Sequence, residues 1–147
     1  FPMSQTVFED VYEFQQRMGQ PVDLGLADGC SGYDGRQLAA LRFDLIDEEV
    51  EELQDATDRL TVALGNGQVD TAHLQSEVLK EAMDLMYVVS GFVVTYFGPD
   101  VAQTAFDRVQ TSNMSKLWSD GSPRFRTDGK VVKPPHYKKP DLRDLVS

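Results

Sequence analysis

The sequence predicts an all-α fold: an antiparallel helical bundle of about four to five helices with an irregular, basic C-terminal tail. Apolar residues recur at helical spacing over most of residues 7–117, and breaks rich in glycine or proline separate these stretches. The pattern changes in the tail, residues 118–147, where residues 124–126 can pair with residues 130–133 as a small hairpin. The chain has 147 residues, which favours a single domain, and we place that domain at residues 3–147.

The first predicted helix covers residues 7–18, where apolar residues fall at helical spacing. Residues 19–35 contain five glycines and little periodicity, so they are expected to form a loop. Asp34 is expected to cap a second helix that reaches residue 64. The two helices are therefore expected to be joined by an irregular segment of unusual length.

The second half of the bundle is expected to contain two further helices. Gly65-Asn66-Gly67 breaks the pattern, and a third helix is expected over residues 71–97. That helix is expected to stop at Gly98-Pro99, after which Asp100 is expected to cap a fourth helix that reaches residue 117.

The charge of the chain is unevenly distributed. Residues 1–115 carry 6 Lys and Arg against 20 Asp and Glu, whereas residues 116–147 carry 8 against 4. The net charge of −10 argues against nucleic acid or an anionic membrane as partner, and the longest uncharged apolar run, residues 85–98, is too short to span a membrane. Cys30 is the single cysteine, so no internal disulfide is expected and a cytoplasmic location fits best.

Several acidic residues fall on the apolar faces of the two central helices. In the second helix, Glu49 and Glu52 lie inside the arc of the buried leucines, and Glu48 lies just beyond its edge. In the third helix, Glu81 lies within the apolar stripe and Asp84 lies near its border. Solvated acids would lie opposite the leucines, so these acids are expected to point inward.

The positions of these acids along the two helices also match. Two antiparallel helices joined by a turn align residues whose numbers have a constant sum. The pair Glu52 and Glu81 has the same sum as the pair Glu49 and Asp84, and this sum places the fold-back within residues 65–67. Four carboxylates are therefore expected to converge between the helices.

Four carboxylates that lie this close together repel one another unless a positive charge lies among them. Two carboxylates about 5 Å apart repel each other by roughly 3 kcal/mol at an effective dielectric constant of about 20. A divalent cation removes this penalty, and Mg²⁺ prefers carboxylates, waters and phosphates as ligands. The alternative is that the acids form structural salt bridges with Arg42, Lys80 or lysines of the tail.

The motif Glu48-Glu49-x-x-Glu52, followed after 28 residues by Glu81-x-x-Asp84, resembles the signature of the all-α nucleoside triphosphate pyrophosphohydrolases. This superfamily includes MazG, the dimeric dUTPases and phosphoribosyl-ATP pyrophosphohydrolase. Asn113-x-x-Lys116 and residues 128–133 are similar to the nucleotide-closing segment of MazG-like members. The resemblance runs from about residue 8 to residue 140, and it is closest to the bacterial MazG-like dUTP pyrophosphatases.

The resemblance implies a role for each part of the motif. The implied metal ligands are Glu49, Glu52, Glu81 and Asp84, and the metal is Mg²⁺, for which Mn²⁺ can substitute. Glu48 would bind a second ion or act as the general base, a role that Glu49 could also take. The implied nucleotide contacts are Asn113, Lys116, Lys130, Lys133 and Tyr137, with Gln15 or Gln16 contacting the base. The tail, residues 118–147, would close over the nucleotide.

The expected function is therefore Mg²⁺-dependent hydrolysis of a nucleoside triphosphate, with dUTP giving dUMP and pyrophosphate in the sanitation of the nucleotide pool. The resemblance implies a homodimer or a homotetramer. Two alternatives stay open: a pyrophosphohydrolase for another, modified nucleotide, and a non-catalytic dimeric interaction module. A metal-storing or oxygen-activating bundle is not expected, because it would need a Glu-x-x-His pair on each of two helices.

Overall fold

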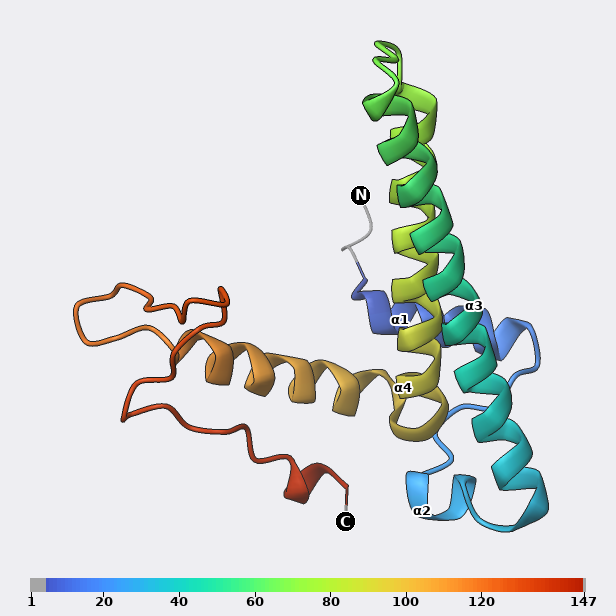
Figure 1. The fold of residues 1–147 in the computed structure, drawn as a ribbon. Coiled ribbons are helices and arrows are strands. Elements are labelled where there is room, and N and C mark those ends of the chain that lie inside the picture. Colours follow the sequence, from blue (N-terminus) through green and yellow to red (C-terminus); the bar gives the residue numbers. More distant parts are fainter. Residues whose placement is uncertain (1–4, 147) are drawn as a thin grey trace. The chain divides into compact units, whose positions relative to one another are not determined.

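The computed structural model describes residues 5–146, so residues 3–4 and 147 of the predicted domain lie outside the described residues. Its regular elements are the helices α1 (Val7–Arg17), α2 (Leu26–Gly29), α3 (Gly32–Gly65) and α4 (Ala72–Met114) and the short 3₁₀ helix η1 (Arg143–Leu145) (Figure 1). The predicted all-α class with an irregular tail is confirmed over these residues. The chain divides into two compact units, which meet in sequence after Pro99.

Helix α1 matches the helix predicted over residues 7–18. It begins with a capping box, in which the Thr6 hydroxyl accepts a hydrogen bond from the Glu9 backbone N–H at 3.1 Å. In return, the Thr6 backbone N–H donates to the Glu9 carboxylate at 3.5 Å. These reciprocal bonds satisfy two donors and fix where the helix starts.

Residues 19–35 differ from the predicted loop, because α2 forms one helical turn within them and α3 already begins at Gly32. Ser31 occupies the N-cap position of α3, so the prediction that Asp34 caps this helix is wrong. Asp34 lies instead in the first turn, where its negative charge still interacts favourably with the helix dipole. A four-residue helix such as α2 is too short to show an apolar period in the sequence.

Helix α3 and the first segment of α4, residues 72–97, form an antiparallel hairpin (Figure 1). Its turn lies between Gly65 and Ala72, which confirms the predicted fold-back. The rings of Phe43 and Phe92 lie 5.5 Å apart between the two helices. This hairpin carries all five acids of the predicted motif.

Helix α4 is interrupted at Gly98, whose φ of 76° is non-helical. Pro99 then occupies the first helical position, and Asp100 lies inside the helix, so the prediction that Asp100 is the cap is wrong. The break leaves carbonyl groups at the end of the first segment without helical donors. Backbone N–H groups of the preceding loop replace those donors: Asp23 donates to Val94, Leu24 to Thr95 and Gly25 to Tyr96, at 2.9–3.2 Å.

The C-terminal unit consists of the second segment of α4, which ends at Met114, and the tail. The predicted hairpin is present as a single bridge between Phe125 and Val131 rather than as two strands. The Trp118 indole N–H donates to the Val132 carbonyl at 3.1 Å. These contacts give the tail a defined path after α4 ends, three residues earlier than predicted.

Helix α4 is long and apolar enough to cross a membrane when only length and composition are considered, with 39% of its most apolar window buried. Core helices of globular proteins meet the same criterion. Within the first unit, this helix packs Tyr87 edge-on against Phe14 of α1 at 5.5 Å. Part of its apolar surface is therefore buried in the core of the first unit, and part of it is exposed.

Candidate functional site

Three of the four predicted metal ligands lie together in the α3–α4 hairpin. Glu49 and Glu52 share one face of α3 because they are three residues apart, and α4 places Glu81 opposite them. One carboxylate oxygen of each residue lies within 4.8 Å of one oxygen of the other two. We call these three residues the acidic triad.

The negative charges of the triad are not fully balanced by nearby positive charges. Burial raises the pKa of Glu49, and the charges of Asp84 and Glu81 raise it further. A hydrogen bond with Glu81 raises the pKa of Glu52, and the charge of Glu49 adds to this effect. Oε2 of Glu49 and Oε2 of Glu81 are buried without a hydrogen-bond partner among the described residues. Oxygen atoms in this arrangement fit a hard divalent cation such as Mg²⁺.

Asp84 lies beside the triad and is held by a lysine. Its Oδ2 forms an ion pair with the Lys80 ammonium at 2.9 Å, and Oε1 of Glu81 accepts a hydrogen bond from the same ammonium at 3.3 Å. These two carboxylates raise the pKa of Lys80. The salt-bridge alternative therefore applies to Asp84 and to one oxygen of Glu81. In the described part of the chain, no salt bridge reaches Glu49 or Glu52.

Arg42 does not pair with the acids, so that part of the salt-bridge hypothesis is wrong. Its buried guanidinium donates to the Gln20 side-chain oxygen at 3.3 Å, and burial lowers its pKa. Arg42 lies seven residues before Glu49, which is about 10 Å along a helix axis. Helical side chains also lean toward the helix N-terminus, so Arg42 leans away from Glu49.

Three further predicted residues lie in the first unit. Glu48 is exposed beside the triad, and its charge contributes to the raised pKa values of Glu49 and Glu52. The Gln15 amide is buried and donates to the Thr95 hydroxyl at 3.0 Å and to the Pro21 carbonyl at 3.1 Å. It thus fastens α1 to α4, whereas Gln16 is exposed. A contact of either glutamine with the base stays a prediction.

Four of the predicted nucleotide contacts lie together in the C-terminal unit. The Lys116 ammonium donates to the Asn113 side-chain oxygen at 3.0 Å and lies 6.0 Å from the ring centre of Tyr137. The Lys133 ammonium lies 5.0 Å from the same ring centre. We call Asn113, Lys116, Lys133 and Tyr137 the tail cluster. For Lys130 the structure gives a backbone N–H that donates to Asp128 at 3.1 Å, and its contact with the nucleotide stays a prediction.

The surroundings of Tyr137 favour its ionised form. A hydrogen bond from Ser112 lowers the pKa of Tyr137, and the charges of Lys133, Lys116 and Lys139 lower it further. Sequence spacing did not identify Ser112 or Lys139. They come from α4 and from the tail, and only the folded path of the tail brings them to one ring.

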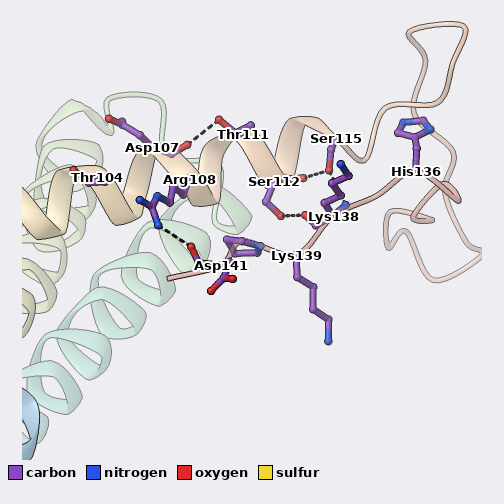
Figure 2. Close-up of a pocket in the computed structure, with 11 residues that line it drawn as sticks. Thr104, Asp107, Arg108, Thr111, Ser112, Ser115, His136, Lys138, Lys139 and Asp141 are labelled. Atoms are coloured by element: carbon purple, nitrogen blue, oxygen red, sulfur yellow. Dashed lines mark hydrogen bonds between the residues drawn. The ribbon is translucent and has the colours of Figure 1, made fainter. Parts of the chain in front are cut away.

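The C-terminal unit also contains a pocket of about 420 Å³ between the second segment of α4 and residues 136–141 (Figure 2). Arg108 donates to the Asp141 carbonyl at 2.9 Å and pairs with the Asp144 carboxylate. The Ser112 hydroxyl donates to the Lys138 carbonyl at 2.7 Å. These bonds hold the tail along the helix. None of the predicted nucleotide contacts lines this pocket.

One known protein family matches most of the chain. Residues 11–101 match the family model of phosphoribosyl-ATP pyrophosphohydrolase. The matched segment includes the acidic triad, Asp84 and Lys80, whereas the tail cluster lies beyond it. A search of curated proteins finds no match.

Proposed function

Because the chain belongs to the phosphoribosyl-ATP pyrophosphohydrolase family, we propose that it is a Mg²⁺-dependent nucleoside triphosphate pyrophosphohydrolase. The family implies a nucleotide substrate and an enzyme that releases pyrophosphate. The observation that carries the proposal is the acidic triad, in which two buried carboxylate oxygens lack a hydrogen-bond partner among the described residues. Charges of this kind are costly in a protein interior unless a cation lies among them.

Glu49, Glu52 and Glu81 would hold the cation, and Asp84 would join them when Lys80 releases it. A bound divalent cation neutralises phosphate oxygens and lowers the pKa of a water molecule. Glu48 is exposed, and we assign to it the role of the base that accepts a proton from the attacking water. As that water bonds to the α-phosphorus, the bond to the bridging oxygen breaks and pyrophosphate leaves with the electron pair.

The tail cluster supplies the positive charge that a triphosphate requires. Lys116 and Lys133 would bind the phosphate oxygens and stabilise the charge that develops on the leaving pyrophosphate. Closing of the tail over the nucleotide would exclude bulk water. The tail cluster supports this proposal because it gathers two lysines around one ring.

We propose dUTP as the preferred substrate, with dUMP and pyrophosphate as products. The support is the similarity of Asn113-x-x-Lys116 and of residues 128–133 to MazG-like members. The family name also makes phosphoribosyl-ATP a candidate, so a substrate panel must contain both. Pyrophosphate release from that panel, with metal and with chelator, tests the function. Release from no member, by a protein that stays folded, would favour a non-catalytic interaction module.

We also propose that two copies of the chain pack through α4. Leu79, Met83 and Met86 recur at helical spacing, and their side chains are 63%, 48% and 50% exposed. Tyr87 and Val89 of the same helix are also exposed, whereas Val94 is fully buried in the core. A second copy of the same stripe offers the apolar surface that would cover these residues.

A further inference from the structure

The ammonium group of Lys80 lies next to the acidic triad and supplies a positive charge there. Its ammonium lies 2.9 Å from Oδ2 of Asp84 and 3.3 Å from Oε1 of Glu81. In residues 5–146, it is the one basic group within ion-pair distance of the acids in the motif. Arg59 of α3 pairs across the hairpin with Glu77 of α4, and not with the acids of the motif.

The two carboxylates that Lys80 binds, those of Glu81 and Asp84, are also predicted ligands of the metal ion. Oε1 of Glu81 accepts from Lys80, while Oε2 of the same carboxylate is buried without a partner among the described residues. Asp84, a predicted ligand of the first ion, lies outside the acidic triad, and its carboxylate is the one closest to the ammonium. The contact with Lys80 therefore occupies a predicted ligand that stands outside the acidic triad.

We propose that Lys80 is a built-in competitor of the divalent cation, which neutralises Asp84 and Glu81 in the metal-free protein and releases Asp84 when the cation binds. The proposal rests on the metal dependence of the proposed function. An ammonium ion and a divalent cation repel each other, and in this proposal both bind the carboxylates of Glu81 and Asp84. The Lys80 side chain is 65% exposed, so it can move into solvent at low cost when the cation arrives.

The competition has two consequences. The metal-free hairpin is stabilised, because one positive charge lies among closely spaced acids. The affinity for the cation is lowered, because metal binding must displace the ammonium from Asp84. Removal of the ammonium should therefore strengthen metal binding, which is the opposite of what loss of a supporting residue would do.

Titration of the metal-free protein with Mn²⁺, followed by the electron paramagnetic resonance signal of the free ion, tests the proposal without any nucleotide. We expect Lys80→Gln to bind Mn²⁺ about fivefold more tightly than the wild type, the order expected for loss of an exposed ion pair. Lys80→Arg, which keeps the charge, should bind like the wild type. Arg59→Gln removes a charge from the same hairpin away from the triad, and should also bind like the wild type. Equal or weaker binding by Lys80→Gln would overturn the proposal.

A second measurement does not depend on the folding of the variant. In the wild type, the side-chain NMR resonances of Lys80 should move toward those of a solvated lysine when Mg²⁺ saturates the site. Unchanged resonances at saturation would overturn the proposal. Loss of nucleotide hydrolysis with both metal results intact would contradict the proposed function alone. Hydrolysis with equal metal affinities in wild type and Lys80→Gln would contradict this inference alone.

Discussion

Glu52 of α3 and Glu81 of α4 approach each other so closely across the hairpin that a hydrogen bond between their carboxyl groups raises the pKa of Glu52. Two carboxylates cannot share a hydrogen bond unless one of them holds a proton. Protonation of one of the two carboxyl groups would therefore take part of the role that a cation has in the metal-bound protein. This relationship links the stability of the hairpin to pH and to metal.

The first prediction concerns this pH dependence. Because the pKa of Glu52 is raised in the folded state, that state binds more protons than the unfolded state above the ordinary value of 4.5. The contribution of Glu52 to stability is full below that value and is lost as the pH rises through the raised pKa. In chelator, the free energy of unfolding of the wild type should therefore fall relative to that of Glu52→Gln as the pH rises toward neutrality. Urea unfolding across this range measures the difference, and parallel profiles of the two proteins would contradict it.

The second prediction concerns the break in α4. A Cβ atom at Gly98 would collide with Oδ1 of Asp23, whose Oδ2 accepts a hydrogen bond from Tyr12 at 2.8 Å. Gly98→Ala adds this collision to the cost of a positive φ, so it should lower the free energy of unfolding by about 3 kcal/mol or more. Gly19 has a similar φ, but a Cβ atom there would meet no other atom within 4 Å, so Gly19→Ala should cost about 1 kcal/mol. Equal losses in the two variants would show that the contact with Asp23 does not matter.

The third prediction concerns the tail cluster. Lys133→Met removes a charge 5.0 Å from the Tyr137 ring centre and should raise KM for the nucleotide by about tenfold, because charge-assisted contacts to phosphate are lost. The effect should shrink at high salt. Arg143→Met serves as the control, because its side chain is 91% exposed and pairs with Asp141. A KM that changes as little in Lys133→Met as in Arg143→Met would remove the tail cluster from the nucleotide site.

The fourth prediction concerns assembly. Met83→Glu places a charge in the exposed apolar stripe of α4 and should convert a dimer into a monomer. Val69→Glu changes the most exposed apolar residue of the turn, at 96% exposure, and should leave the assembly intact. Analytical ultracentrifugation distinguishes the two outcomes. A Met83→Glu protein that sediments like the wild type would exclude this stripe as the interface.

The arrangement of the hairpin could be predicted from the sequence because its signals are periodic. The three-residue spacing of Glu49 and Glu52 and the turn near residue 66 are enough to bring Glu81 opposite them. The caps were harder to predict. Asp34 and Asp100 are good N-cap residues, but Ser31 and the break at Gly98 lie closer to where the helices begin.

The partners of single charged side chains could not be predicted, because they depend on directions that spacing does not contain. Arg42 lies on the same helix as the acids, yet its side chain turns to Gln20. The sequence offered several possible partners for the acids of the motif, and the folded structure shows that Lys80 is the one that pairs with Asp84. Likewise, Ser112 and Lys139 join Tyr137 through the path of the tail.

The most direct test of the central claim is pyrophosphate release from a panel that contains dUTP, other nucleoside triphosphates and phosphoribosyl-ATP, measured with Mg²⁺ and with chelator. We predict release that requires Mg²⁺, is fastest with dUTP, and falls by a factor of about 100 or more in Glu49→Gln. Circular dichroism of the variant confirms that its helices are retained. Release that persists in chelator, or that is unchanged in folded Glu49→Gln, would contradict a catalytic metal centre at the acidic triad.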